Sequence, residues 1–244
     1  MSTDIIQEQF VHSLSDRSLQ LNDTQLQQFE LYYQLLVEWN GKMNLTAITE
    51  REQVYDKHFY DSLSLCFYMN VQQVRTLADI GSGAGFPAIP LKIAFPHLNI
   101  TIVDSLNKRI HFLNHVASEL GLQDVHTVHA RAEDAARIPS LRDSFDLVTA
   151  RAVARLVVLN ELCLPFVKPG GTFAAMKASD AKEELDEADY SFGVLRAKVF
   201  QIESFQLTRE QATRTIILAR KIASTSKKYP RKAGTPAKSP LLRS

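Results

Sequence analysis

Cysteine is scarce in this chain of 244 residues, and long apolar runs are missing. The two cysteines, Cys66 and Cys163, each lie amid apolar residues, which favours buried free thiols in a reducing cytosol. No apolar run reaches about 18 residues, the length of a membrane-spanning helix. The segment from Met1 to Gln20 also lacks a basic start followed by an apolar core. We therefore expect a cytoplasmic protein that neither spans a membrane nor carries the usual secretory signal.

Acidic residues are missing from the end of the chain. Residues 211–244 contain nine Lys or Arg and no Asp or Glu, whereas residues 1–210 contain 19 basic and 27 acidic residues. In this basic end, cations are interleaved with one tyrosine and three prolines. Proline keeps a segment extended, and cations spaced along an extended chain can follow phosphates, although a solvated tail is the alternative. The candidate residues for contacts with an anionic polymer are Lys227, Lys228, Arg231, Lys232 and Lys238.

The first 70 residues are predicted to form an N-terminal helical extension. Asn22-Asp23-Thr24 is a helix start signal, and apolar residues then repeat at steps of three and four up to Trp39. Gly41 is expected to end this helix. A second amphipathic helix is expected over about Val54 to Met69, and it carries His58, Asp61 and Ser62.

Strand and helix patterns alternate over residues 71–222, and a tail follows over residues 223–244. Alternation of this kind predicts a doubly wound α/β domain with a mostly parallel sheet. Its last two strands, Val199–Gln206 and Thr213–Arg220, are expected to form a hairpin, which makes one strand antiparallel. In this the expected sheet resembles that of SAM (S-adenosylmethionine) dependent methyltransferases. The expected elements are strand Thr76–Ile80, helix Phe86–Phe95, strand Ile100–Asp104, helix Lys108–Leu120, strand Val125–His129, strand Phe145–Thr149, helix Arg155–Val167, a turn at Lys168-Pro169-Gly170, strand Gly171–Lys177, and strands Val199–Gln206 and Thr213–Arg220.

Three of the nine glycines alternate in the segment Asp79-Ile80-Gly81-Ser82-Gly83-Ala84-Gly85-Phe86-Pro87. Glycine lacks a Cβ, so backbone and ligand can approach closely, and the helix start that follows points free N–H groups at the loop. A dinucleotide-binding fingerprint counted from Gly81 would need its third glycine at position 86, where this chain has Phe86. The pattern argues against a nicotinamide dehydrogenase and resembles the first motif of SAM-dependent methyltransferases.

Two carboxylates next to this loop suit a cationic cofactor with a ribose. Asp79 would repel a pyrophosphate but attract the ammonium and sulfonium groups of SAM, by about 4 kcal/mol at 4 Å for an effective dielectric of 20, before desolvation. Asp104 ends the next strand, where a carboxylate accepts hydrogen bonds from ribose hydroxyls. A helix N-cap is the alternative role for Asp104.

The turns after the third and fourth strands carry further candidates. Arg131-Ala132-Glu133-Asp134 follows the third strand, where an acid could accept from an adenine amino group, with a loop cap as the alternative. After the fourth strand, Thr149-Ala150-Arg151-Ala152-Val153 has neither an Asn-Pro-Pro-Tyr type motif nor a cysteine nucleophile. The acceptor atom should therefore be nucleophilic already, as purine N7 is. His111 and His115 have metal-ligand spacing but no evident third ligand, so no metal is expected.

Several segments together resemble the RsmG (glucose-inhibited division protein B) family of bacterial small-subunit ribosomal RNA methyltransferases, which modify a guanine at N7. The resemblance covers essentially the whole chain. It rests on Trp39-Asn40, Asn44-Leu45-Thr46, His58-Phe59-Tyr60-Asp61-Ser62-Leu63, the glycine segment, Thr149-Ala150-Arg151-Ala152, and Lys228-Tyr229-Pro230-Arg231-Lys232-Ala233-Gly234-Thr235-Pro236.

The resemblance implies cofactor contacts from Gly81, Phe86, Ala132, Glu133 and Arg151. With our own candidates, the predicted cofactor-binding set is Asp79, Gly81, Gly83, Gly85, Phe86, Asp104, Ala132, Glu133 and Arg151, with Arg151 also the candidate catalytic residue.

The expected partner is small-subunit ribosomal RNA or a ribosomal particle, bound by a monomer. Guanine N7 has an outward lone pair, so in-line transfer needs positioning and no general base. His58 and Asp61 either contribute to the RNA side of the pocket or form a pair that locks the N-terminal helices onto the core. A methyltransferase for transfer RNA or another substrate, and a non-catalytic RNA-binding protein, are the alternatives.

Overall fold

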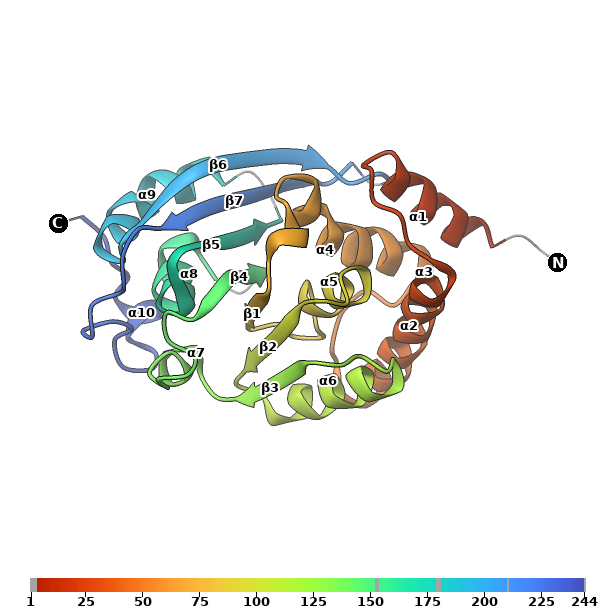
Figure 1. Cartoon of the computed structure of the whole chain (residues 1–244), viewed down its shortest axis with the longest axis horizontal. Coiled ribbons are helices and arrows are strands. Elements are labelled where there is room, and N and C mark those ends of the chain that lie inside the picture. The colour runs from red at the N-terminus through yellow and green to blue at the C-terminus, as the bar shows by residue number, and fades with distance from the viewer. Residues whose placement is uncertain (1–3, 152–153, 179–180, 210, 244) are drawn as a thin grey trace.

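The computed structural model describes residues 4–151, 154–178, 181–209 and 211–243, and its centre is a seven-stranded sheet (Figure 1). The strand order is β3-β2-β1-β4-β5-β7-β6, with every pair parallel except the two that involve β7. The strands are β1 (Thr76–Ile80), β2 (Asn99–Asp104), β3 (Val125–His129), β4 (Phe145–Arg151), β5 (Val167–Lys177), β6 (Ala197–Gln206) and β7 (Thr213–Lys221). The predicted doubly wound sheet with a terminal antiparallel hairpin is confirmed.

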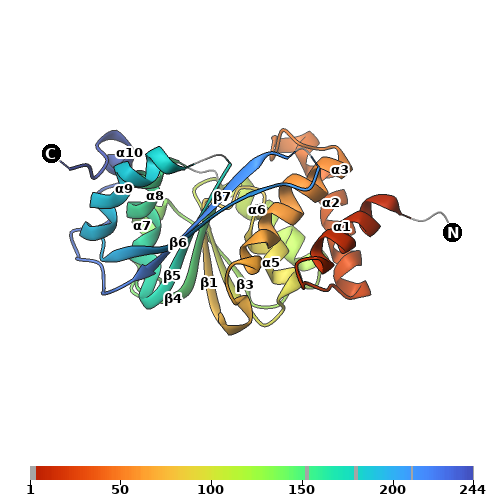
Figure 2. The ribbon, with the colours of Figure 1, turned by 90° about the horizontal axis from the view of Figure 1, so that it is seen from above.

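Helices cover both faces of the sheet, so that the molecule has three layers (Figure 2). One face carries α5 (Ala88–Ala94) and α6 (Asn107–Glu119), over which the N-terminal helices pack. The other face carries α8 (Leu156–Cys163), α9 (Lys182–Val194) and the short α7 (Ala132–Ala135). Alternate strand residues enter the two cores, as Leu77 and Ala78 do, because side chains of a strand point to opposite faces. The sequence analysis did not predict α9.

The N-terminal region is helical, as predicted, but its boundaries differ. It contains α1 (Ile5–Ser15), α2 (Asp23–Met43), α3 (Arg51–Val54), the π-helix η1 (Tyr55–Tyr60), α4 (Asp61–Leu63) and the 3₁₀-helices η2 (Ser64–Phe67) and η3 (Val71–Gln73). The expectation that Gly41 ends the first long helix is wrong, because α2 continues to Met43 and ends at Asn44, which has φ of 48°. The second predicted helix is instead a series of short helical segments. Its π-turn carries His58, and such turns are frequent at functional sites.

The strand β5 begins earlier than expected. Lys168-Pro169-Gly170 was predicted as a turn before the strand, but β5 already pairs with β4 at Val167. The register then shifts between Phe145 and Leu147, so the extra residues form an irregularity within the ladder. The preceding helix ends at Cys163 and passes through the 3₁₀-helix η4 (Leu164–Phe166).

The C-terminal end is folded against the domain, and the expectation of an extended tail is wrong for residues 225–238. Tyr229, Pro230 and Pro236 are buried, and a short helix, α10 (Thr235–Lys238), follows Gly234. In Figure 1 this segment lies beside α7 and α8, far from the N-terminal helices. The division into units 1–70, 71–222 and 223–244 stays a prediction.

Both cysteines are free thiols, as predicted. Cys163 is buried, whereas the expectation of burial is wrong for Cys66, which is half-buried. Of the helices in the described residues, none has the length and apolar character needed to cross a bilayer.

Candidate active site

A cavity of about 670 Å³ opens at the carboxyl ends of the parallel strands. Nucleotide-like ligands bind at this edge of open α/β sheets. Of the predicted cofactor-binding residues, those that line the cavity are Gly81, Gly83, Phe86, Asp104, Ala132, Glu133 and Arg151. Asp79 and Gly85 are not among the lining residues. The fold therefore brings seven of the nine predicted cofactor-binding residues together at the cavity, and the other two lie behind its wall.

The glycine loop combines open space on one side with tight packing on the other. Gly81 and Gly83 have φ of 72° and 63°, and a Cβ added at Gly83 would meet no atom within 4 Å. Gly85 has φ of 102°, and its Cβ would lie 2.7 Å from Tyr32 Oη and 2.8 Å from Ile89 Cγ1. Gly83 therefore leaves room for a ligand, whereas Gly85 leaves room for the protein itself.

The N-terminal helices hold this loop from behind. Tyr32, on α2, is fully buried and donates a hydrogen bond of 2.5 Å to the carbonyl of Ala84. Its ring stacks on Phe59 at 5.3 Å and contacts Phe86 at 5.5 Å. His58 stacks on the same Phe86 ring at 4.5 Å. The aromatic side chains thus fix both the loop and the ring of Phe86 that lines the cavity.

Asp79 lies beneath the cavity floor. Its side chain is fully buried, and Oδ1 accepts a hydrogen bond of 2.8 Å from Thr149 Oγ1. Oδ2 has no hydrogen-bond partner in the described part of the chain. Burial raises the pKa of Asp79 to about 7, against the lowering effect of nearby hydrogen bonds and of Arg151. A cation bound above the floor would favour the charged form of this carboxyl group.

Asp104 faces the cavity and also organises its edge. Oδ1 accepts from the amide of Leu106 at 2.9 Å, just before α6, and Oδ2 accepts from the amide of Gly83 at 3.2 Å. Arg109 lies 3.4 Å from Oδ2. The carboxylate therefore joins the glycine loop to the start of α6, so that the cap-like role and the ligand-facing position coexist in one residue.

Arg151 is held in a fixed position at the end of β4. Its Nη1 donates to Asp61 Oδ2 at 3.0 Å and to the carbonyl of Lys57 at 3.1 Å, and its guanidinium lies 4.9 Å from the centre of the Phe86 ring. Asp61 also pairs with Arg214 Nε at 3.2 Å. One carboxylate thus orients two cations at the cavity wall. Ala152 and Val153, which follow in the predicted motif, lie outside the described residues.

His58 and Asp61 do not bond to each other in the described structure; each instead contacts Arg151. His58 Nε2 lies 2.9 Å from Thr46 Oγ1, and its Nδ1 lies 3.4 Å from Arg151 Nη2. Burial, together with Arg151, lowers the pKa of His58 to about 3. The imidazole is therefore neutral near pH 7. Both residues connect the N-terminal helices to the sheet, and both also line the cavity.

Sequence reasoning missed five cations of the wall, namely Lys57, Arg109, Arg131, Lys177 and Arg214, and the last two come from neighbouring strands. Lys177 ends β5 and pairs in register with Thr215 of the antiparallel strand β7. The start of an antiparallel strand lies at the same edge as the end of its parallel neighbour, so Arg214 reaches the same site. The predicted hairpin contained this signal.

The predicted RNA-binding residues lie on the C-terminal segment, at one side of the cavity. Lys227, Lys228, Lys232 and Lys238 are exposed, whereas Arg231 pairs with the buried Glu161. Between them, Gly234 and Ala237 line the cavity. Glu133 accepts a hydrogen bond of 2.8 Å from the amide of Gly234. This carboxylate therefore contacts the C-terminal segment on one side and faces the cavity on the other.

The predicted absence of a metal site concerned His111 and His115. His111 Nε2 lies 3.2 Å from Asn107 Nδ2, and His115 lies against Trp39 at 5.2 Å between ring centres. Within the described ranges, no three His, Cys, Asp or Glu side chains are grouped so that they could hold a metal ion.

The donors and acceptors of the cavity fit an adenosine with a cationic amino acid end. The open side of Gly83 gives access to backbone, Asp104 is a buried acceptor at the cavity surface, and Asp79 lies beneath the loop, where a bound cation would favour its charged form. Solved structures with this fold include a SAM-dependent methyltransferase from Aquifex aeolicus, with 14% identity and a TM-score of 0.54 over 73% of this chain and 97% of that chain. Another is M. jannaschii TYW2 in complex with AdoMet, with 16% identity and a TM-score of 0.52 over 67% of this chain and 75% of that chain. These likenesses show that the chain has the fold found in SAM-dependent methyltransferases.

The family follows from closer relatives. The family model described as rRNA small subunit methyltransferase G matches residues 25–214. Proteins named ribosomal RNA small subunit methyltransferase G from Staphylococcus carnosus and Bacillus velezensis are each 56% identical to this chain, over 97% and 96% of it and over 99% and 98% of their own lengths. The chain belongs to the rRNA small subunit methyltransferase G family, and SAM is its cofactor.

Proposed function

We propose that the protein, acting as a monomer in the cytoplasm, transfers a methyl group from SAM to N7 of a guanine in small-subunit ribosomal RNA. The names of its relatives support the RNA class. The observation that carries the choice of N7 is a cavity wall whose described residues include fixed cations but no free base, since Asp61 is paired with Arg151 and Arg214 and His58 has a pKa of about 3.

We propose that Gly81, Gly83, Phe86, Asp104, Ala132 and Glu133 bind the cofactor at the cavity surface. Asp79 and Gly85 would act from behind it, Asp79 through its charge and Gly85 by letting Tyr32 approach the loop. When bound, SAM supplies an electrophilic methyl group. The residues of this chain then need only hold an acceptor in line with that methyl group, which contributes about 7 to 11 kcal/mol at best.

A general base would need a pKa near the working pH and a free lone pair. His58 is too weak a base, and Asp61 already accepts hydrogen bonds from Arg151 and Arg214. Asp104 likewise accepts two backbone hydrogen bonds, and Glu133 accepts one from Gly234. Asp79 has a pKa of about 7, but it is not among the residues that line the cavity and so does not face an acceptor. These residues favour an acceptor that attacks without losing a proton, and N7 of guanine meets that condition.

Arg151 is the proposed catalytic residue because it lies between the proposed cofactor wall and the proposed RNA side of the cavity. Its ring contact with Phe86 places it beside the cofactor wall, and its charge can bind guanine O6 or a nearby phosphate. A hydrogen bond to N7 itself would occupy the nucleophile. Arg214 and Lys177 would add positive potential on the RNA side.

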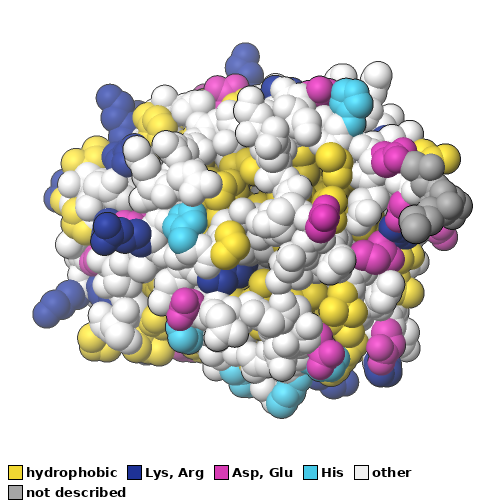
Figure 3. All heavy atoms as spheres, turned by 45° about the vertical axis from the view of Figure 1, so that its right-hand side comes forward, with side chains coloured by type: hydrophobic (Ala, Val, Ile, Leu, Met, Phe, Trp, Pro, Cys, Tyr) yellow, Lys and Arg dark blue, Asp and Glu magenta, His cyan; other side chains and the backbone are white. Residues whose placement is uncertain are grey.

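The surface of the protein is consistent with one-sided RNA binding. On the face drawn in Figure 3, acidic side chains gather mainly on the half nearest the N-terminus, and Lys and Arg lie mainly on the other half. The exposed lysines of the C-terminal segment add to this basic side. An anionic polymer would approach from there.

Small-subunit RNA made with 7-deazaguanosine tests the acceptor atom, because a CH group replaces N7. We expect labelled SAM to methylate RNA with ordinary guanosine and RNA with inosine at the mapped position, since both keep N7, but not 7-deaza RNA. Labelling of the 7-deaza RNA would rule out N7. Label on transfer RNA in a mixture of both RNAs would overturn the substrate class.

A further inference from the structure

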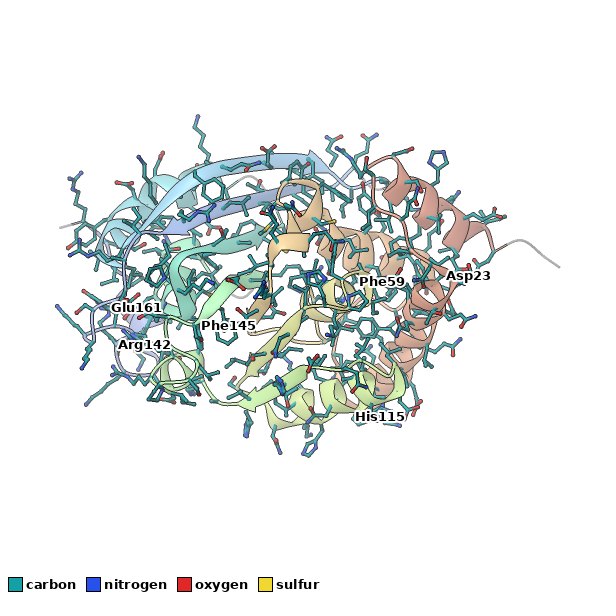
Figure 4. The ribbon with its side chains drawn as sticks, in the orientation of Figure 1. Asp23, Phe59, His115, Arg142, Phe145 and Glu161 are labelled. Atoms are coloured by element: carbon teal, nitrogen blue, oxygen red, sulfur yellow. The ribbon has the colours of Figure 1, made fainter. Side chains whose placement is uncertain are left out.

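The C-terminal segment, residues 225–238, is anchored along one side of the cavity, and we call it the C-terminal strap. At its start, Arg142 Nη2 donates to the carbonyls of Thr225 and Ser226 at 2.8 and 3.1 Å, and the buried Lys221 donates to Thr225 Oγ1 at 2.5 Å. Further on, Arg137 donates to the carbonyl of Pro230. Figure 4 shows Arg142 and Glu161 on the side of the molecule where the strap passes.

The strongest anchor is the pair between Arg231 and Glu161. Glu161, on α8, is only 1% exposed. Its Oε1 accepts from the backbone amide of Arg231 at 2.7 Å and from Nε at 2.9 Å, and its Oε2 accepts from Nη2 at 2.6 Å. A buried carboxylate needs such partners, and the bidentate geometry fixes the direction of the chain at this point. The neighbouring Leu162 lines the cavity.

Three residues beyond this anchor, the strap reaches the cofactor side of the cavity. Gly234 donates its amide to Glu133, and both Gly234 and Ala237 belong to the cavity wall. A ligand that fills the cavity therefore meets these two residues only while the strap is docked. A ligand that binds one state better than another shifts the equilibrium toward that state, and the effect is reciprocal.

We propose that Arg231 and Glu161 are positioning residues of the cofactor site: their ion pair holds the strap against the cavity, so that SAM binding and strap docking stabilise each other. This role rests on SAM as the ligand and is independent of which base is methylated. It also assigns Arg231 a function different from that of its neighbours Lys228 and Lys232, whose side chains are exposed.

Arg231→Met tests the pair, and Lys232→Met is the matched control, because it removes the same charge from an exposed position one residue away. We expect Arg231→Met to raise the SAM dissociation constant, measured by calorimetry, by a factor within the range of about 5 to 150 that such couplings span. We expect Lys232→Met to leave it unchanged. Equal SAM affinity of the two variants would overturn the proposal.

Hydrogen exchange of the Gly234 amide gives a second readout that needs no variant and no RNA. Saturating SAM should slow exchange at Gly234 and Arg231 in the wild-type protein by a factor similar to the loss of affinity in Arg231→Met. Identical exchange rates with and without SAM would overturn the coupling. If the SAM affinities and exchange rates change as expected but the wild-type protein does not methylate small-subunit RNA, the result would count against the proposed function alone.

A truncation after Ser226 covers the case in which Arg231→Met fails to fold. It keeps the contacts of Thr225 and Ser226 with Lys221 and Arg142, and it opens Glu161 to water. Its SAM affinity should fall at least as far as that of Arg231→Met. Wild-type SAM affinity in the truncated protein would contradict a role for the strap.

Discussion

Two segments from opposite ends of the chain close the same cavity, and they are held by different forces. On one side is the N-terminal wall, in which Tyr32, His58 and Phe59 pack around Phe86. On the other side is the C-terminal strap, held by hydrogen bonds and by the pair of Arg231 with Glu161. Figure 4 shows Phe59 among the N-terminal helices and Glu161 on the opposite side.

The two sides differ in the free energy that it costs to open them. Tyr32 and Phe59 are fully buried, and exposing a large aromatic side chain costs about 1.5 to 3 kcal/mol each before hydrogen bonds are counted. The strap buries Tyr229 and two prolines, and its charged groups regain hydration when it opens. The N-terminal wall is therefore expected to open only with the whole domain, whereas the strap can open locally.

The largest predicted effect lies in the floor between the two sides and follows from Asp79. Burial raises its pKa to about 7, so the folded state binds a proton that the unfolded state loses near its usual pKa of 3.8. The stability from this group is present in acid and disappears as pH rises to about 7. Relative to Asp79→Asn, the free energy of unfolding of the wild-type protein should fall by about 2.5 kcal/mol between pH 5 and 7.5.

Urea unfolding of both proteins at several pH values measures this difference. Because Asp79 lies in the cavity floor, its titration should change the stability of the whole domain, and not of one side alone. Parallel stability curves for wild type and Asp79→Asn would show that Asp79 does not titrate in this range. The cavity floor would then contribute nothing to the pH dependence of the free energy of unfolding.

The second prediction concerns Gly85, where a larger residue should disrupt the packing of the N-terminal wall. A Cβ there would lie within 3.0 Å of Tyr32, Ile89 and Leu113, and the backbone has φ of 102°. We expect Gly85→Ala to lower the free energy of unfolding by about 2 kcal/mol, from overpacking and backbone strain together. Gly121→Ala is the control, since Gly121 also has positive φ but open space around it. Equal losses in the two variants would show that packing against Tyr32 contributes nothing.

The local features of this site were predictable from the sequence, and the contacts between distant segments were not. The glycine loop, Asp104 and the strands are encoded by spacing within a few residues, because strand periodicity and positive φ are local properties. The sequence predicted Arg151 as a site residue, but its partner Asp61 is 90 residues away. The pairing of Arg231 with Glu161, 70 residues apart, was equally hidden.

The basic end of the chain shows why composition alone misled. Nine cations without an acid suggested an extended tail, yet its partners Glu133 and Glu161 lie in the preceding domain. Tyr229 and the prolines, which indicated an extended segment, are instead the residues that pack against the core. The lysines of the C-terminal strap keep the solvent exposure that the composition suggested.

The third prediction removes one polar contact from the N-terminal wall. Tyr32→Phe keeps the aromatic packing but leaves the carbonyl of Ala84 without its donor. We expect a loss of about 1 to 2 kcal/mol in the free energy of unfolding, since a buried acceptor left unpaired costs roughly its desolvation. Tyr33→Phe is the matched control, because its hydroxyl makes a longer bond of 3.3 Å to Thr49 in a half-buried position. A smaller loss of unfolding free energy for Tyr32→Phe than for Tyr33→Phe would contradict the inference that the Tyr32 hydroxyl holds the glycine loop.

The smallest predicted effect is a difference between the two sides in how their amide exchange responds to salt. Raising ionic strength from about 0.05 to 1 M shortens the screening length to about 3 Å, which weakens partly exposed ion pairs but not aromatic packing. The side chain of Arg231 is 22% exposed, so salt reaches its pair with Glu161. Exchange of the Gly234 amide should therefore become faster by less than about fivefold, which corresponds to under about 1 kcal/mol. The Gly85 amide, which donates to Ser82 behind the loop, should not change. Equal acceleration at both amides would mean that the strap and the N-terminal wall open as one unit, and the contrast between them would not hold.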